Sequence, residues 1–368
     1  GNIQYLAADD VALAGLNGAN VRVEATGGSI TDNGDNHVDI VAGTAQLVAG
    51  DSIGEAALPA NNGAVDTTVT TVASSAGTGS TYLSETDDLV IGSVAAIDVR
   101  RPDFDGNNPL QPGSPLAGAI AAQNLKVEAD NSLTVNNPVE ATNADLLLHA
   151  QNDNLAVNST VDAGGNASLL ASANLTQAAA GDVTVGGNLD VEAGGAITMD
   201  ADAASTSTGN GNIRYLSTAG DITLGLLDAG TGNVRVEAQD GSIVDGRSAD
   251  TNVTASNLQL VTNQTLAALA DIGASGADAL DLDVDTLAAA SAGDIYLSEA
   301  DGLNLTTVAD FDVTRVGIDS SAAATSVGAL SNVSGADNVK LETVAGDLTV
   351  TDTVTATAGD LLLDAAGN

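Results

Sequence analysis

The chain has 368 residues, of which 43% are hydrophobic and 2% aromatic, and it contains neither Cys nor Trp. Disulfides, thiol catalysis and cysteine metal sites are therefore excluded, and the small aliphatic residues suit a thin core laid out along an axis better than a thick globular one. With 49 acidic against 9 basic residues, the net charge of -40 argues against nucleic acid and anionic membrane surfaces as partners, because both are bound mainly through Lys and Arg.

A long repeat of about 214 residues organises the chain. The opening GNIQYL (1–6) returns as GNIRYL (211–216), and NVRVEA occurs both at 20–25 and at 233–238. We therefore predict a first long repeat unit over 1–210 and a second, incomplete copy over 211–368. The opening carries neither Met nor a signal-peptide pattern, and we expect the chain to be an excerpt from a longer one. No stretch approaches the ~20 apolar residues of a membrane span.

A proline-rich stretch interrupts the first copy. Four of the six prolines fall in RPDFDGNNPLQPGSP (101–115), which we interpret as a loop projecting from the body of the protein. Within it Asp103, Asp105 and Asn107 stand at alternate positions around Gly106, as in a Ca²⁺ loop that lacks the bidentate Glu. The pattern predicts a calcium site there, and a plain solvated turn is the alternative.

A short repeat runs through the middle of the chain. An Asn or Asp is followed by an apolar-x-apolar triplet, so that Leu125 and Val127 face one way while Lys126 and Glu128 face the other, which is the period of a strand. Stacking such coils of about 21–24 residues buries their apolar faces together, and this predicts an all-β fold, a parallel β-helix solenoid. The Asn/Asp column is expected to form a structural ladder at one corner of the coils. Its members are Asn124, Asp145, Asn166, Asn188, Asn212, Asn233 and Asn257.

The few basic residues recur in basic-x-acidic pairs along these strands. The pairs are Arg22 with Glu24, Lys126 with Glu128, Arg235 with Glu237, and Lys340 with Glu342. Across neighbouring coils Asp190 and Arg214 are expected to face each other as a surface ion pair worth about 0–1 kcal/mol. His149 falls beside Glu128 in the outward column, which favours a surface neighbour over a base or ligand, and with His37 as the other histidine no catalytic triad is predicted.

An acidic strand and two irregular stretches are further features of the sequence. Asp281, Asp283 and Asp285 share one strand face, which is typical of a solvated outer surface and compatible with calcium. The less regular stretches 55–80 and 264–293 are expected to carry longer turns.

Coils such as AGDVTVGGNLDVEAGGAITMDA (180–201) and TAGDLLLDAAGN (357–368) resemble the repeat regions of large bacterial surface proteins of the filamentous haemagglutinin type. The resemblance covers essentially the whole chain. It implies a secreted, right-handed β-helix with adhesive, matrix or filament roles, located outside the cell or on its surface.

The functional expectation is a structural repeat protein that forms a rod, filament shaft or adhesin stalk, with further copies of itself as partners, end to end or in a longer chain. The first alternative is an adhesive module in which the loop 101–115 or the acidic face binds a receptor, a glycan or Ca²⁺. A polysaccharide-acting enzyme is the weakest alternative, because it needs paired acids with aromatic platforms or a basic groove. We therefore predict no catalytic residue and no required cofactor.

Overall fold

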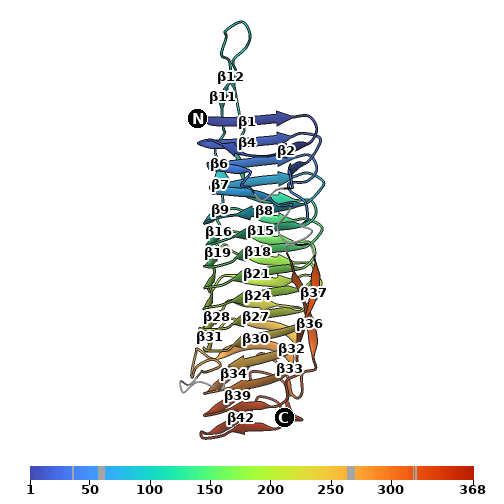
Figure 1. Ribbon diagram of the computed structural model, residues 1–368. Helices are drawn as coiled ribbons and strands as arrows, with labels where there is room; N and C mark the ends of the chain where they lie inside the picture. The colour runs from blue at the N-terminus through green and yellow to red at the C-terminus, as the bar shows by residue number, and fades with distance from the viewer. Residues whose placement is uncertain (35–36, 57–62, 263–269, 318, 320) are drawn as a thin grey trace. The chain divides into compact units, whose positions relative to one another are not determined.

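The computed structural model describes residues 1–34, 37–56, 63–262, 270–317, 319 and 321–368. It divides into two compact units, unit 1 with Gly1–Gly165 and Val316–Ala322, and unit 2 with Asn166–Arg315 and Ala323–Asn368. Every regular element in these residues is a β-strand. No helix that could cross a membrane occurs among them. Within each unit the strands pair in parallel, coil upon coil, and the predicted parallel β-helix is confirmed (Figure 1).

The strands of unit 1 are short, and most belong to the stacked coils. They are β1 Asn2–Ala7, β2 Val11–Leu13, β3 Leu16–Asn17, β4 Asn20–Ala25, β5 Ile30–Asp32, β6 Ile40–Ala49, β7 Val65–Ala76, β8 Thr81–Glu85, β9 Leu89–Ile91, β10 Ser93–Val94, β11 Val99–Arg100, β12 Leu110–Gln111, β13 Leu116–Ala117, β14 Ala119–Ala121, β15 Leu125–Ala129, β16 Leu133–Val135, β17 Val139–Ala141, β18 Leu146–Ala150, β19 Leu155–Val157 and β20 Val161–Ala163.

Unit 2 repeats this organisation. Its strands are β21 Ala167–Ala171, β22 Leu175–Gln177, β23 Val183–Val185, β24 Leu189–Ala193, β25 Ile197–Met199, β26 Ala204–Ser207, β27 Ile213–Ser217, β28 Ile222–Leu224, β29 Leu226–Asp228, β30 Asn233–Ala238, β31 Ile243–Asp245, β32 Val253–Thr262, β33 Leu280–Ser291, β34 Ile295–Glu299, β35 Leu303–Leu305, β38 Val333–Gly335, β39 Val339–Thr343, β40 Leu348–Val350, β41 Val354–Ala356 and β42 Leu361–Ala365. A separate hairpin is formed by β36 Phe311–Val316 and β37 Ala322–Val327.

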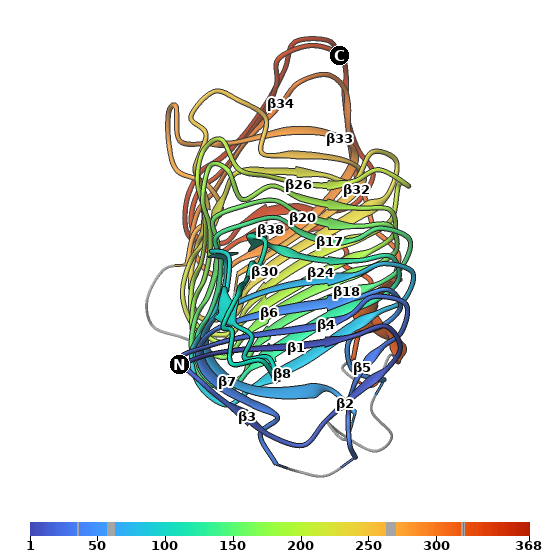
Figure 2. The ribbon, with the colours of Figure 1, turned by 90° about the horizontal axis from the view of Figure 1, so that it is seen from above.

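A regular coil consists of three strands joined by short turns. In unit 1, β15, β16 and β17 make one coil and β18, β19 and β20 make the next. Figure 2 shows from above how strands of successive coils, such as β1, β4 and β6, follow one another. Like residues stack on like, and the facing pairs are Leu125 with Leu146, Leu133 with Leu155, and Val139 with Val161.

The alternation of the sequence decides which side chains form the core. Leu125, Val127 and Ala129 point inward and are fully buried, and the three-residue strand β16 shows a buried, half-buried, buried pattern. Parallel strands buried in this way are rich in Val, Leu and Ile because these side chains pack well against their neighbours on a pleated, buried sheet. Stacked aliphatic rows therefore form the core in each unit.

Long strands occur where the sequence was interpreted as irregular. β7 and β33 each run for 12 residues inside the stretches 55–80 and 264–293, so the prediction of longer turns is wrong for these parts. In VDTTVTTVASSA the inward positions alternate from Val65 to Val69 and again from Val72 to Ala76, and the alternation shifts at Thr70 and Thr71. Thr and Ser continue the pattern without strong hydrophobicity, and burial on stacking completes the strand. Residues 57–62 and 263–269 of the same stretches lie outside the described residues.

One glycine position is fixed by the backbone in both copies of the long repeat. Gly54 and Gly273 have φ of 68° and 65°, and a Cβ at either position would lie 2.5 Å or 2.4 Å from the carbonyl oxygen of Tyr82 or Tyr296. Only glycine combines a positive φ with such a close approach of the next coil. The turn is therefore reproduced by the same residue type in each copy.

Candidate functional site

The predicted loop 101–115 lies in an antiparallel hairpin, which we call the first hairpin (residues 93–117). β11 pairs with β12, and the base of the hairpin packs Val94, Ile97 and Leu116 onto Ala73 on the outer face of the coils. All residues from 101 to 110 are exposed, and Phe104 has a relative exposure of 111%. Figure 1 shows β11 and β12 extending past β1. The loop thus projects, but from an anchored base.

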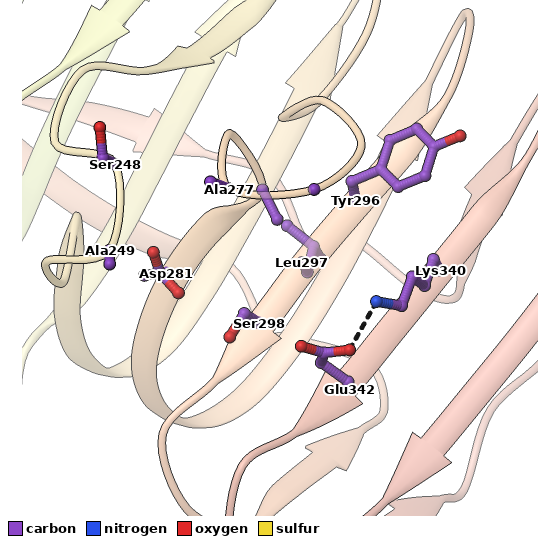
Figure 3. A pocket seen from close by; sticks show the side chains of 11 residues that line it. Ser248, Ala249, Ala277, Asp281, Tyr296, Leu297, Ser298, Lys340 and Glu342 are labelled. Carbon is purple, nitrogen blue, oxygen red and sulfur yellow. Dashed lines mark ion pairs between the residues drawn. The ribbon is translucent and has the colours of Figure 1, made fainter.

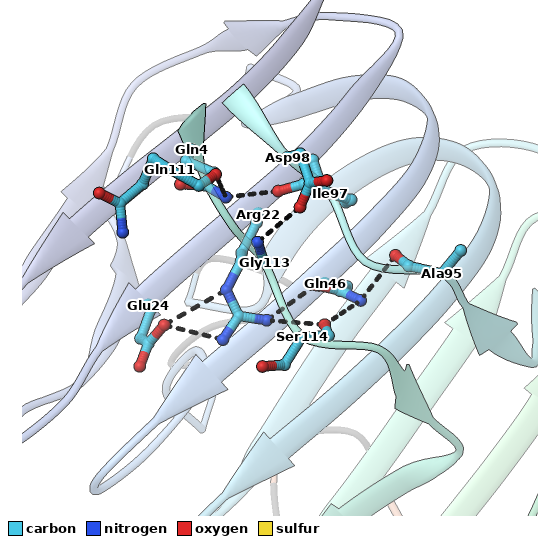
Figure 4. Close-up of polar contacts among 10 residues, drawn as sticks. All are labelled: Gln4, Arg22, Glu24, Gln46, Ala95, Ile97, Asp98, Gln111, Gly113 and Ser114. Carbon is cyan, nitrogen blue, oxygen red and sulfur yellow. Dashed lines mark hydrogen bonds and ion pairs between the residues drawn. The ribbon is translucent and has the colours of Figure 1, made fainter. Parts of the chain in front are cut away.

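A buried glutamine holds this base. The Gln46 amide donates to the carbonyl oxygens of Val94, Ala95 and Ser114 at 3.0, 3.1 and 3.0 Å. Its own carbonyl accepts from Arg22 Nη1 at 2.8 Å (Figure 4). An unpaired amide buried in this way would be costly, so the three backbone carbonyls fix where the hairpin leaves the coil.

Besides Gln46, Arg22 also contacts Glu24. The Arg22 guanidinium forms an ion pair of 2.8 Å with Glu24. A separate hydrogen bond closes the hairpin, in which Asp98 accepts from the backbone N–H of Gly113 at 2.8 Å (Figure 4). The expected basic-x-acidic pair is therefore confirmed, and it belongs to the hairpin support.

Unit 2 contains the same anchor at the same places in the long repeat. Gln259 donates to the carbonyl oxygens of Val308, Ala309 and Gly328 at 3.3, 3.4 and 3.1 Å, and it accepts from Arg235 at 2.7 Å. Arg235 pairs with its neighbouring glutamate as Arg22 does. No sequence pattern marks these glutamines as a site, since Gln in an outward strand position looks like ordinary surface.

The segment that Gln259 anchors crosses an acidic coil, defined as residues 188–210. There Asp190 accepts from Arg214 Nε at 2.8 Å and from Arg315 Nε at 2.7 Å. Glu192 accepts from Arg214 Nη2 at 2.8 Å and from Arg315 Nη2. Two arginines from different elements therefore clamp an Asp-x-Glu pair on β24.

This contact corrects the predicted surface ion pair. Asp190 and Arg214 do face each other, in the register that pairs β24 with β27, but Asp190 is 0% and Arg214 9% exposed because β36 covers them. Burial opposes ionisation of Glu192, yet hydrogen bonds and charge from Arg315 and then Arg214 hold its pKa below the usual value. A covered network of this kind is sensitive to the loss of any one member.

The corner column forms side-chain to backbone bridges between successive coils. In unit 1 the Asn124 Oδ1 accepts from the Asp145 N–H at 3.1 Å. In unit 2 the corresponding acceptor–donor pairs are Asn166 with Asn188 at 2.9 Å, Asn188 with Asn212 at 2.7 Å, and Asn212 with Asn233 at 2.9 Å. Asn257 continues the column by donating its side-chain amide to Asn233 Oδ1 at 2.8 Å.

The remaining polar column of unit 1 involves both predicted neighbours of Glu128. His149 Nδ1 lies 2.9 Å from Glu128 Oε1, so the predicted pairing is confirmed. Lys126 is buried: its Nζ donates to the Gly317 carbonyl at 2.5 Å and stands 5.8 Å from the Tyr82 ring centroid. Burial lowers the pKa of Lys126 to about 8 in spite of nearby carboxylates. The other histidine, His37, is exposed.

The predicted calcium residues lie together at the exposed tip of the first hairpin. Asp103 Oδ1 accepts from the backbone N–H groups of Asp105 and Asn107 at 3.0 and 2.7 Å. This is an Asx turn, in which the carboxylate organises the loop by itself. Calcium binding by these three residues stays a prediction.

A second acidic group combines a predicted residue with two that sequence reasoning missed. Ligand oxygens of Asp283, Glu299 and Asp301 lie within 4.8 Å of one another. They meet because β33 pairs with β34, whereas the prediction placed Asp283 with its strand neighbours Asp281 and Asp285. Burial raises the pKa of Glu299 to about 7 against the hydrogen bond from the Val284 N–H.

A small cavity of about 160 Å³ opens between β33, β34 and β39. Lys340 and Glu342 lie at one side of it and form an ion pair of 2.5 Å, with Tyr296 above them (Figure 3). The volume is below the roughly 300–1,000 Å³ of small-molecule sites, and the two charges satisfy each other.

No protein-family model matches this sequence, and no curated protein or solved structure matches the chain. The likeness to filamentous haemagglutinin repeats therefore stays a prediction.

Proposed function

We propose that the chain is a structural repeat module of an extracellular filament, adhesin stalk or cell-surface shaft. The observation that carries this proposal is the reproduction of one anchored hairpin, Gln46 with Arg22 in unit 1 and Gln259 with Arg235 in unit 2, on coils that pair in register within each unit. Such a chain gains length by repeating coils, and each added coil needs no new fold information.

The composition supports the same role. The net charge of -40 keeps neighbouring molecules apart and soluble, and the many acidic side chains lie on outward strand positions such as Asp283 and Asp285. Further copies of the repeat are the partners this architecture needs, end to end or in one longer chain.

Immunogold labelling of the organism that makes the chain tests the proposal. An antibody against the purified chain is expected to decorate fibres outside the cell. Label confined to the cell interior would contradict the extracellular structural role, and pre-immune serum provides the control.

A second candidate function, adhesive binding, is favoured by one observation. At the tip of the first hairpin Phe104 is fully exposed to solvent, and Leu110 of the same hairpin is 55% exposed. An exposed aromatic side chain on a projecting loop can contact a receptor or glycan. Phe104→Ala is expected to reduce binding to host cells or glycan surfaces, while Val244→Ala, an exposed aliphatic residue of unit 2, leaves it unchanged. Equal binding by both variants would remove this candidate.

Calcium belongs to the second candidate. If the tip residues Asp103, Asp105 and Asn107 bind Ca²⁺, amide exchange of the tip is expected to slow when calcium replaces a chelator. The variant Asp105→Asn should lose that response. Identical exchange with calcium and with chelator would show that the Asx turn alone shapes the tip.

A further inference from the structure

The end of unit 1 formed by β1 exposes side chains that are buried at the equivalent place in unit 2. Tyr5 and Leu6 are 48% and 49% exposed, whereas Tyr215 and Leu216 are 1% and 8% exposed. β27 has β24 on one side and β30 on the other. Among the described strands β1 pairs only with β4. The exposed pair on β1 therefore marks a surface that a β24-like strand covers in unit 2.

The first hairpin shows the same difference. Arg101 follows Val94 by seven residues, as Arg315 follows Val308. Arg315 binds both carboxylates of the acidic coil. Arg101 is exposed, and within the described part of the chain no carboxylate lies within ion-pair distance of it.

Both hairpins leave their coils in the same direction. The Asn2 amide donates to the Asp98 carbonyl at 2.9 Å, and the Asn212 amide donates to the Asp312 carbonyl at 2.8 Å. Gln4 stands where unit 2 has Arg214, and its amide donates to the Ile97 carbonyl (Figure 4). The first hairpin is thus held over β1 as the second is held over β27, and it reaches past β1 on the side where the acidic coil would stack.

We propose that β1 and the first hairpin form a docking face for the last coil of another long repeat unit, a coil of the acidic type seen at residues 188–210. Its Asp-x-Glu pair binds Arg101 and its Asp faces Gln4. Its apolar row covers the inward Tyr5, and its Glu lies opposite the outward Leu6, as Glu192 lies opposite Leu216. This inference deepens the proposed structural role and rests on it for its biological meaning. The hairpin then binds a preceding coil only if that coil carries the Asp-x-Glu pair of the last coil of a repeat.

The other end of the chain fits this face less well. If β42 stacked directly on β1, the position that Asp190 occupies on β24 would be taken by Leu362, and only Asp364 would remain acidic. Arg101 would then lose one of the two carboxylates that Arg315 uses. Charge complementarity therefore selects an acidic coil over a second copy stacked through β42.

The test extends the chain with its own coils. Residues 166–210 are joined ahead of Gly1, so that Asn210–Gly1 reproduces the natural Asn210–Gly211 junction. Amide exchange of β1 is expected to slow at least about tenfold relative to the parent chain. Arg101→Glu should lower the melting temperature of the extended chain by about as much as Arg315→Glu does, and should leave the parent chain unchanged.

Matched variants keep the result interpretable. In the added segment, replacing the copies of Asp190 and Glu192 by Lys should restore the stability of the extended chain that carries Arg101→Glu. If Arg101→Glu prevents folding, Arg101→Gln is used instead. Unchanged exchange of β1, or an extended chain indifferent to Arg101→Glu, would overturn the proposal. Concentration-dependent assembly of the parent chain with protection of β1 would also overturn it, by showing that β42 is the occupant. None of these results bears on whether the fibres are extracellular, which immunogold labelling decides separately.

Discussion

At the scale of single residues, two buried carboxyl groups stand at equivalent positions of the two copies. Glu85 and Glu299 are 1% and 0% exposed. Burial raises the pKa of each to about 7 from an ordinary value of 4.5, although hydrogen bonds, from Thr67 to Glu85 and from Val284 to Glu299, oppose the shift. Folding therefore favours the protonated form of both groups.

The raised pKa of Glu85 predicts a pH-dependent stability. A group whose pKa is higher in the folded than in the unfolded state contributes fully below about pH 4.5, and this contribution is lost as the pH rises through about 7. At roughly 1.4 kcal/mol per unit of pKa, ionising one such carboxyl costs on the order of 3 kcal/mol. Glu85→Gln should abolish its share of the stability loss between about pH 5 and pH 8, measured by urea unfolding.

Two controls accompany this experiment. Glu299→Gln should behave like Glu85→Gln, because the environment is repeated, and the exposed Glu55→Gln should leave the pH profile unchanged. A Glu85→Gln variant that loses as much stability with rising pH as the parent chain would refute the assignment.

The covered ion network predicts an unequal response to the loss of carboxylates. Asp190→Ala leaves Arg214 and Arg315 without their shared buried partner, and removing one member of such a group costs about 3–5 kcal/mol. Glu237→Ala removes a partly exposed partner of Arg235 and should cost only about 0–1 kcal/mol. Comparable losses in chemical denaturation would mean that the hairpin does not desolvate Asp190.

At the scale of elements, the hairpins depend on one amide each. Gln46→Ala removes three hydrogen bonds to the hairpin backbone and one from Arg22, leaving buried groups unpaired, so a loss of about 2–3 kcal/mol is expected. Amide exchange should accelerate in the first hairpin and remain slow in β15. Gln259→Ala is the matched variant for unit 2. A hairpin that stays protected without Gln46 would show that the apolar contacts of Val94 and Ile97 suffice.

Also at this scale, the sequence predicted the strands of the regular coils and missed what covers them. Period-two alternation after Asn124 is a local signal, and it gave the correct strand and the correct inward face. The burial of Lys126 and Asp190 is not local, because it depends on segments that lie about 120 to 190 residues further along the chain. Polar residues of an outward column look solvated until such a distant segment is placed on them.

At the scale of the whole molecule, the long repeat organises polar contacts as well as coils. The turn glycines, the buried glutamates and the Gln–Arg anchors all recur at intervals of about 213 to 219 residues. Sequence comparison of the two copies detected the interval, but only the hydrogen bonds show why these polar residues have to recur together with the hairpin. A module that is repeated along a longer fibre has to carry each hairpin together with the residues that anchor it.

The most direct test of this account is electron microscopy of native fibres, averaged along their axis. Coils about 4.8 Å apart and about ten coils per long repeat predict an axial repeat near 50 Å, with hairpin density recurring once in each repeat. Fibres with that repeat would support the structural role. Fibres that lack it, or a native protein found only as single molecules bound to a ligand, would contradict it.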